Sequence, residues 1–198
     1  VLVAVSLTTL GCVQSEPEVI VIQPRPYPER PSIAVIEFEN RTGYDGLGWG
    51  LADMLESALI RTQRYDVVSR RQWDAILEEQ MRQDAFVDPR SAARTGRLLG
   101  VKYLITGSVN QALVEPVCLS LPGFEFYGTQ ASVGVTLQVI DVETGRIIDA
   151  PEAYGTATSA KITVDTVQVG SARWSSSLLG RASRDAIDKL VNKLVYSF

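Results

Sequence analysis

Four glycines, Gly43, Gly46, Gly48 and Gly50, lie between the first expected strand and the first expected helix. A phosphate-binding loop would occupy this place, because glycine lets backbone N–H groups approach an anion closely. The Lys-Ser/Thr pair of a P-loop is absent, and so is a G-x-G-x-x-G pattern whose third glycine opens a helix. We therefore favour a plain tight turn over nucleotide binding at this loop.

The sequence contains no histidine, and its two cysteines are Cys12 and Cys118. These absences exclude Ser-His-Asp and Cys-His catalysis, imidazole general bases and histidine-containing metal sites. Two cysteines are also too few for a cysteine-rich zinc or iron–sulfur site. We therefore predict a protein that is not an enzyme, with no catalytic residue, no metal site and no cofactor.

Cys12 follows an apolar N-terminal run. Val1–Leu10 carries no charge, and a run of about ten residues is too short to span a bilayer but fits the apolar part of a secretory signal peptide. The Gly11-Cys12 pair at its end is similar to the cleavage site of bacterial lipoproteins, in which the cysteine becomes the lipidated first residue. We expect residues 1–11 to be a signal peptide remnant and Cys12 to be lipidated. The alternative is a buried N-terminal strand with an ordinary cysteine.

A proline-rich segment follows Cys12, with prolines at positions 24, 26, 28 and 31. Proline favours an extended, stiff backbone of roughly 3.1 Å per residue, so nine such residues would span about 28 Å. We expect residues 12–31 to be the lipidated cysteine and a tether that holds a domain away from a membrane surface.

The composition indicates an ordinary globular domain. The chain has 198 residues, of which 45% are hydrophobic and 21% are charged, so it is neither a disordered chain nor a polytopic membrane protein. The net charge is −4. A nucleic-acid partner is therefore not expected, because it would require a basic face.

The apolar pattern predicts one α/β domain over residues 32–198. Strands are expected at 32–38, 65–69, 101–109, 131–142 and 146–148, with a turn at Glu143-Thr144-Gly145. Helical spacing predicts one helix that contains Leu51, Met54, Leu55, Ala58 and Leu59, and a C-terminal helix at about 176–196. Two further helices are expected after Ser69 and from Asp88-Pro89 to Gly100. This order is typical of a three-layer domain with a mixed central β-sheet flanked by helices, plus extended β-hairpins.

Four segments resemble the CsgG family, the curli production assembly/transport family of outer-membrane lipoproteins. They are SIAVIEFENRTG, LADMLESALIRTQRYDVVSRRQWDAILEEQ, VDPRSAARTGRLLGVKYLITGSV and LQVIDVETGRII, in this order. The resemblance implies a periplasmic α/β domain that assembles into rings beneath the outer membrane. In the best-known member each subunit also donates two β-hairpins to one transmembrane barrel, and the ring exports amyloid subunits. The resemblance further implies that Asn40, Tyr44 and Trp49 line a constriction of the ring.

Two segments decide whether this chain enters the membrane, residues 111–130 and 155–177. Within the first, an alternating apolar set comprises Val117, Leu119, Leu121, Phe124 and Phe126. A membrane-spanning strand needs roughly 9–11 residues, so each segment of about 20 barely holds two. Glu115 and Pro116 also make a poor lipid-facing strand, since proline has no N–H for the ladder. We favour hairpins that contact a neighbouring subunit over hairpins that span the membrane.

These observations predict an outer-membrane lipoprotein of CsgG type, anchored at the periplasmic face through a lipid. It would form a homo-oligomeric ring that serves as an envelope scaffold or as an export and assembly channel. Its partners would be the outer membrane and other envelope or secreted proteins. The alternative is a monomeric periplasmic adaptor that docks on an envelope enzyme or machine.

Overall fold

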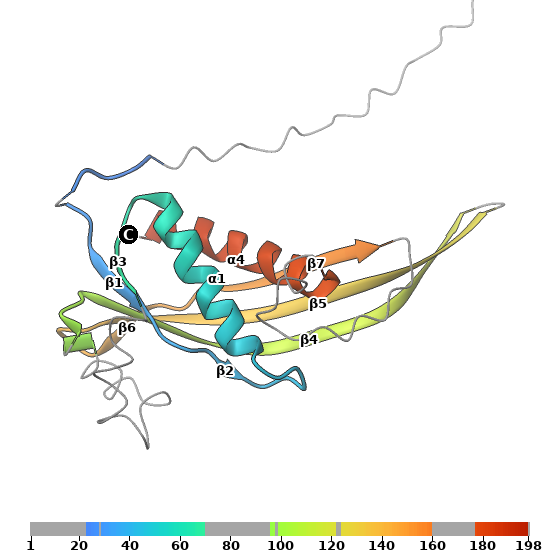
Figure 1. The fold of residues 1–198 in the computed structure, drawn as a ribbon, viewed down its shortest axis with the longest axis horizontal. Coiled ribbons are helices and arrows are strands. Elements are labelled where there is room, and N and C mark those ends of the chain that lie inside the picture. The colour runs from blue at the N-terminus through green and yellow to red at the C-terminus, as the bar shows by residue number, and fades with distance from the viewer. Residues whose placement is uncertain are drawn as a thin grey trace, which may run out of the picture.

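The computed structural model describes residues 23–27, 29–69, 96–97, 99–121, 124–159 and 177–197, with backbone alone at 118–121 and 124–127. Two helices lie across one face of a sheet, and two long strands extend beyond them as a hairpin (Figure 1). Cys12 lies outside the described residues. The same holds for the expected helix after Ser69, the start of the helix at Asp88-Pro89 and most of the expected second hairpin.

The elements alternate early in the chain and form a meander later, as the sequence predicts. In chain order they are β1 Ser32–Val35, β2 Glu39–Asn40, α1 Leu47–Thr62, β3 Asp66–Val68, β4 Tyr103–Leu121, β5 Phe124–Asp141, β6 Arg146–Asp149, β7 Glu152–Ser159 and α4 Leu178–Ser197. Residues 96, 97 and 99 are also helical, and Gly100 follows them with φ 66°. The expected end of a helix at Gly100 is therefore confirmed.

The sheet is mixed, which confirms the predicted fold class. Its main strand order is β3-β1-β4-β5-β6, with β2 beside β4 and β7 beside β5. The pairs formed by β1 with β3 and β4, and by β2 with β4, are parallel. The pairs formed by β5 with β4, β6 and β7 are antiparallel. The parallel half thus carries the first βαβ connection, and the antiparallel half carries the meander.

The main core lies between the sheet and the two helices. Val133, Val135, Leu137 and Val139 of β5 alternate toward this core, as expected for a strand with one face buried. Six apolar residues of α4 at helical spacing are buried in this core: Leu179, Ala186, Ile187, Leu190, Val191 and Leu194. Gly155 of β7 lets α4 approach closely, because a Cβ there would lie 2.0 Å from the Ala182 oxygen.

A second, smaller core lies on the opposite face of the sheet. It contains Ala34, Ile36, Val101, Leu104, Ile140 and Val142, and Leu99 packs against it. Gly96 lies so close to Val142 that an added Cβ would be 2.3 Å from a methyl carbon. Apolar residues therefore line both faces of β1, which explains the nearly continuous apolar run at 32–38.

Helix α1 begins four residues earlier than its apolar spacing suggests, at Leu47 instead of Leu51. Gly46 has φ 73° immediately before the helix, a backbone conformation that glycine adopts without steric cost. Gly48 then lies against the preceding segment, because a Cβ there would be 2.1 Å from the Phe38 oxygen. The glycines favour helix entry at this point, and Gly48 and Gly50 belong to the helix and not to the loop.

The turn between β5 and β6 lies where the sequence places it. Asp141 Oδ1 accepts hydrogen bonds from the Thr144 backbone N and Oγ1, at 2.7 and 2.8 Å. These two donors stabilise the ionised carboxylate and lower the pKa of Asp141. Gly145 follows with φ 68°, so the residues of this turn have the side chains that its geometry requires.

Candidate functional site

The hairpin expected at 111–130 is the continuation of the two longest strands. Register partners run without a break from Gln111 with Gly134 to Leu121 with Phe124. Strands 101–109 and 131–142 are thus the inner halves of β4 and β5, not separate elements. Leu113 and Val114 are 48% and 40% exposed where the hairpin leaves the helices.

The five apolar positions of the hairpin occupy matching places in its register. Leu119 pairs with Phe126, Leu121 pairs with Phe124, and Val117 pairs with Gly128. Because sides alternate along a strand, positions 117, 119, 121, 124 and 126 fall on one side of the two-stranded ribbon. Val117 is half-buried. The described side chains do not include the other four, so their contact with a membrane or with a subunit stays a prediction.

Pro116 lies within β4 as the register partner of Thr129. Proline thus does not prevent pairing of β4 with β5 here, and the expectation that Glu115 and Pro116 make a poor lipid-facing strand stays a prediction. Among the described strands, β2 is the last to pair with the outer edge of β4, and it ends at Asn40 beside Val109. Beyond Val109 no described strand pairs with this edge of β4, and a missing N–H can be tolerated at such an edge.

A hydrogen-bonded bulge marks the place where the hairpin leaves the core. The β4–β5 register shifts between Val109 and Gln111, which leaves Asn110 without a register partner. Asn110 Nδ2 donates to Thr136 Oγ1 at 2.9 Å, and Asn110 Oδ1 accepts from Ser108 Oγ at 3.0 Å. Bulges bend and twist a strand, so this residue sets the direction in which the hairpin projects.

An ion pair lies beside the bulge. Arg41 Nη2 is 2.6 Å from Glu39 Oε2, and Arg41 Nη1 also donates to Asn110 Oδ1 at 3.5 Å. The hydrogen bond from Arg41 lowers the pKa of Glu39, and the carboxylate raises the pKa of Arg41. Both side chains are more than half exposed, so the pair orders the surface more than it stabilises the fold.

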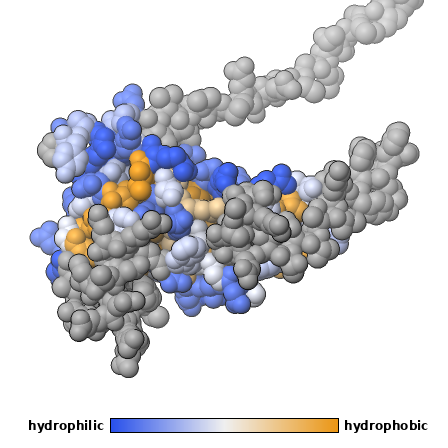
Figure 2. All heavy atoms as spheres, viewed as in Figure 1, coloured by the Kyte–Doolittle hydropathy of each residue, from blue (hydrophilic) through white to orange (hydrophobic). Residues whose placement is uncertain are grey.

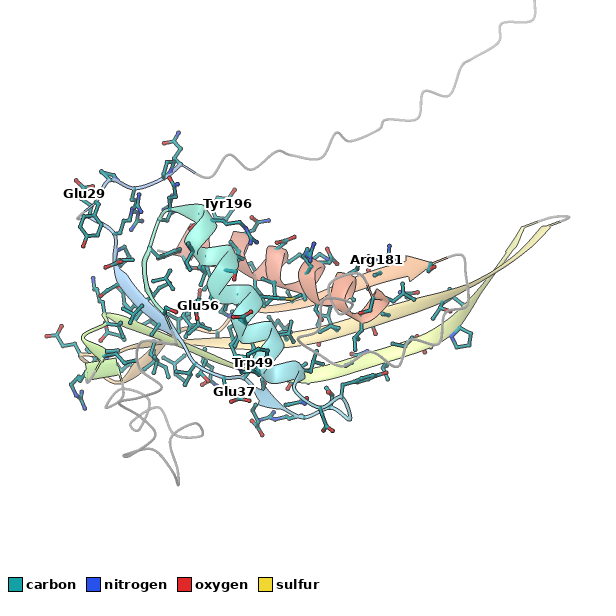
Figure 3. The ribbon with its side chains drawn as sticks, in the orientation of Figure 1. Glu29, Glu37, Trp49, Glu56, Arg181 and Tyr196 are labelled. Atoms are coloured by element: carbon teal, nitrogen blue, oxygen red, sulfur yellow. The ribbon has the colours of Figure 1, made fainter. Side chains whose placement is uncertain are left out.

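The loop that follows β2 holds two of the three residues expected at a constriction. Asn40 Nδ2 donates to the backbone oxygen of Tyr44 at 2.7 Å, and Asn40 Oδ1 accepts from the Thr42 backbone N at 3.0 Å. Tyr44 is half-buried and packs against the main core. Trp49 lies in the first turn of α1 and is 43% exposed (Figure 3). The structure thus joins Asn40 and Tyr44 in one turn, while Trp49 lies on the helix.

The outer edge of β7 is covered by charged side chains of α4, a feature that the sequence analysis missed. Four α4 residues at intervals of four bond to backbone atoms of alternate β7 residues: Arg181 with the Thr158 oxygen, Asp185 with the Thr156 N–H, Lys189 with the Tyr154 oxygen, and Lys193 with the Glu152 oxygen. A free strand edge is a template for unwanted pairing. This row of four charged side chains supplies hydrogen-bond partners for backbone groups along this edge of β7. The sequence shows the spacing of four between these charged residues, but that spacing alone predicts only a solvent-exposed helix face.

The proline-rich segment is attached to the domain where the structure describes it. The Arg25 N–H donates to the Gln63 oxygen at 3.2 Å, and Arg64 Nη1 donates to the Gln23 oxygen at 3.4 Å. The Asp66 N–H donates to the Pro31 oxygen at 3.0 Å. The described residues 23–27 and 29–31 are therefore attached to the domain at three points, and the tether role of residues 12–31 stays a prediction.

A groove of about 330 Å³ runs between α1 and α4. Its lining residues include Asp53, Arg61, Arg184 and Asp188, together with Met54 and Ile187.

Within the described ranges, no group of three or more His, Cys, Asp or Glu residues could hold a metal ion. No helix in the described part of the chain is long and apolar enough to cross a membrane.

These features define a mixed α/β module with both long helices on one face and a hairpin that prolongs its central strands. The chain belongs to the family described as "Curli production assembly/transport component CsgG", whose sequence pattern matches residues 14–198. The predicted family is therefore confirmed. No curated protein sequence matches the chain.

Solved structures from three organisms have the same fold. The hypothetical protein CT253 from Chlamydia trachomatis is 12% identical, with a TM-score of 0.56 over 84% of this chain and 96% of that chain. PelC from Paraburkholderia phytofirmans, a dodecamer, is 19% identical, with a TM-score of 0.52 over 87% and 94%. Lipoprotein GNA1162 from Neisseria meningitidis is 15% identical, with a TM-score of 0.53 over 84% and 99%.

Proposed function

We propose that the protein is an outer-membrane lipoprotein, anchored through Cys12 at the periplasmic face, that works as a homo-oligomeric ring. The ring acts as an envelope scaffold or as an export and assembly channel, and it performs no catalysis. The observation that carries this proposal is the family match over residues 14–198. It is supported by the dodecameric state of PelC, whose fold this chain has.

The distribution of exposed apolar side chains supports an assembly over a monomeric adaptor. An adaptor should present one apolar patch to its partner. In the described part of the chain, large exposed apolar residues lie instead on separate elements: Tyr27 before β1, Trp49 and Ile60 on α1, Leu113 and Val114 on β4, Ile147 and Ile148 on β6, Tyr154 on β7, and Tyr196 on α4. A subunit with two neighbours needs at least two contact surfaces, because ring contacts are heterologous.

The outer edge of β7 and the outer edge of β4 beyond Val109 differ in whether they are covered. The edge of β7 is covered within its own subunit, whereas no described strand pairs with the outer edge of β4 beyond Val109. Among the described strands, the outer half of β4 is therefore an open edge, as are the outer edges of β3 and β6. We place the subunit contact on the hairpin, at positions 117–126.

The oligomeric state tests the proposal. The full chain, expressed with its N-terminal segment and extracted in mild detergent, should give closed ring particles by electron microscopy. Its mass should be a whole multiple of the mature subunit mass, just below the 21.7 kDa of the full sequence. A protein that stays monomeric at all accessible concentrations would refute the ring and favour the monomeric adaptor.

The anchor has its own test. Cys12→Ser should abolish incorporation of labelled palmitate and release the protein from the membrane fraction, because the acylated sulfur is lost. Cys118→Ser is the matched control and should leave labelling unchanged. Equal labelling of wild type and the Cys12 variant would refute the anchor without refuting the ring.

A further inference from the structure

One side chain, that of Asn40, closes the loop between β2 and α1, which we call the β2–α1 loop (residues 41–46). Its Nδ2 donates to the backbone oxygen of Tyr44 at 2.7 Å. Its Oδ1 accepts from the backbone N and from Oγ1 of Thr42, at 3.0 and 2.7 Å. The Tyr44 oxygen also accepts from the N–H of Leu47, the first residue of α1, at 3.4 Å. Asn40 therefore holds the loop and connects it to the start of the helix.

The backbone of the same residue is paired with β4. Asn40 is the register partner of Val109, and the N–H of Arg41 donates to the Val109 oxygen at 3.0 Å. The first turn of α1 lies on β2, because a Cβ added to Gly48 would be 3.4 Å from the Cβ of Asn40. Asn40 thus belongs to the loop through its side chain and to the sheet through its backbone.

The hairpin begins at the residue of β4 that follows Val109. Asn110 is the bulge residue, and its Nδ2 and Oδ1 bond to Thr136 Oγ1 and Ser108 Oγ at 2.9 and 3.0 Å. A bulge bends a strand and so sets the direction of the chain beyond it. Because Arg41 donates to the oxygen of Val109, a change in the direction of the hairpin displaces the acceptor on which the first residue of the loop depends.

These hydrogen bonds lie at the surface of the molecule. Residues 39–41 are exposed, and Figure 2 shows mostly hydrophilic residues along the lower margin, where β2 and the loop lie in Figure 1. Water can replace an exposed hydrogen bond, so such a bond contributes little to global stability. It opens locally instead, without unfolding of the core. We therefore expect these bonds to determine position more than stability.

We propose that Asn40 and Asn110 form a link that holds the β4–β5 hairpin and the β2–α1 loop in one arrangement. A hairpin fixed against a neighbouring subunit then also fixes the loop, and a hairpin without a neighbour lets the loop open more often. Both asparagines act as positioning residues. The link follows from the hydrogen bonds described above, and its use in assembly rests on the proposed function.

Hydrogen exchange of the full chain, followed by mass spectrometry, tests the link. Asn110→Ala removes the side-chain bonds of the bulge and should raise exchange of residues 41–47 roughly fivefold, the factor expected for one lost hydrogen bond. Asn40→Ala removes the side-chain bonds of the loop and should raise exchange of residues 107–113 by a similar factor. Each variant thus changes the segment that does not carry it, because coupling between two sites is reciprocal.

Two further variants make the result specific. Gln138→Ala is the matched control, because Gln138 is an exposed amide on the same side of β5 as Thr136, and it should change neither segment. Asn40→Asp keeps the acceptor for Thr42 and loses the donor to Tyr44, so it should raise exchange of residues 107–113 even if Asn40→Ala does not fold. Variants that change only their own segment, or a control that changes both, would refute the link.

The oligomer tests the use of the link in assembly. Leu119→Arg should lower the oligomer mass and raise exchange of residues 41–47. In the Asn110→Ala background this exchange should already be high and should not rise further. A lower mass with unchanged exchange of the loop would refute transmission from the hairpin. An unchanged mass would refute the hairpin contact of the proposed function, while the asparagine variants still decide the link.

Discussion

Lys189 of α4 donates from Nζ to the backbone oxygen of Tyr154 in β7 at 2.9 Å, and the same ammonium group is 2.7 Å from Asp185 Oδ2. Asp185 in turn accepts from the Thr156 N–H at 2.9 Å. One ion pair thus satisfies a donor and an acceptor of a strand edge that no other described strand covers. The helix acts here as a substitute for a neighbouring strand.

Loss of this edge cover should affect association more than stability. Lys189→Met combined with Lys193→Met exposes two backbone oxygens of β7, yet should cost about 1 kcal/mol or less, because these ammonium groups are exposed. Light scattering at high protein concentration should detect more self-association than in wild type. Arg184→Met is the control, since it removes an exposed charge of α4 that has no described bond to β7. Equal scattering by the two variants would contradict the role of the row.

The close approach of α4 to β7 gives a second prediction. Gly155→Ala places a methyl group 2.0 Å from the Ala182 oxygen and 2.4 Å from the Ala186 nitrogen. Both are backbone atoms, so the helix must shift, and the cost should be about 1–3 kcal/mol in urea unfolding. Gly43→Ala should be near neutral, because nothing lies within 4 Å of its added Cβ. A Gly155 variant as stable as the Gly43 variant would show that α4 does not pack there.

Asp141 gives the fold a pH dependence with a definite sign. Its pKa is lowered in the folded state by the Thr144 donors. The stabilisation is therefore present above the unfolded pKa of about 3.9 and is lost as pH falls through the folded value. Asp141→Asn should flatten the loss of stability below about pH 4, measured by thermal melting from neutral to acid pH. Glu143→Gln, in the same turn, should leave the acid branch as in wild type, and a change equal to that of Asp141→Asn would contradict the assignment.

The hairpin position Leu119 distinguishes the two environments proposed for it. If the hairpin contacts a subunit, Leu119→Arg should lower the oligomer mass in size-exclusion chromatography and leave the melting of each subunit unchanged. If the hairpin spans a membrane, the same change should cost about 2–4 kcal/mol and prevent insertion. Ser120→Arg, at the neighbouring position of the strand, is the control. Unchanged mass and melting in both variants would leave position 119 on an ordinary surface.

The sequence predicts the elements better than it predicts their lengths. Alternation at Val133, Val135, Leu137 and Val139 locates β5 correctly, because one buried face imposes a period of two. The alternating set that includes Phe124 and Phe126 predicts the outer hairpin, but Gly128, Thr129 and Gln130 interrupt the apolar pattern, so the continuity of β5 from Phe124 to Asp141 is not predicted. The start of α1 at Leu47 is also not predicted. Gly48 has a low helix propensity, and its place in the helix depends on the close contact with the Phe38 backbone.

The surfaces are harder to predict than the core, for a physical reason. Apolar periodicity reports burial within one chain, so the buried residues of α4 can be identified from spacing. The row from Arg181 to Lys193 is polar, and only the structure places the β7 backbone beside it. The contacts of the tether with Gln63 and Arg64 are of the same kind, because each joins a backbone oxygen to a polar donor distant in sequence.

The entry of the tether into β1 also determines how the domain bears mechanical load. β1 lies between β3 and β4 and is parallel to both. A force applied at Cys12 reaches this inner strand after it breaks the contacts of Gln23, Arg25 and Pro31. Pulled along its own axis, β1 must break its hydrogen bonds to both neighbours together and not one after another. A tether joined to an edge strand would peel away under tension, whereas this one loads the sheet in shear.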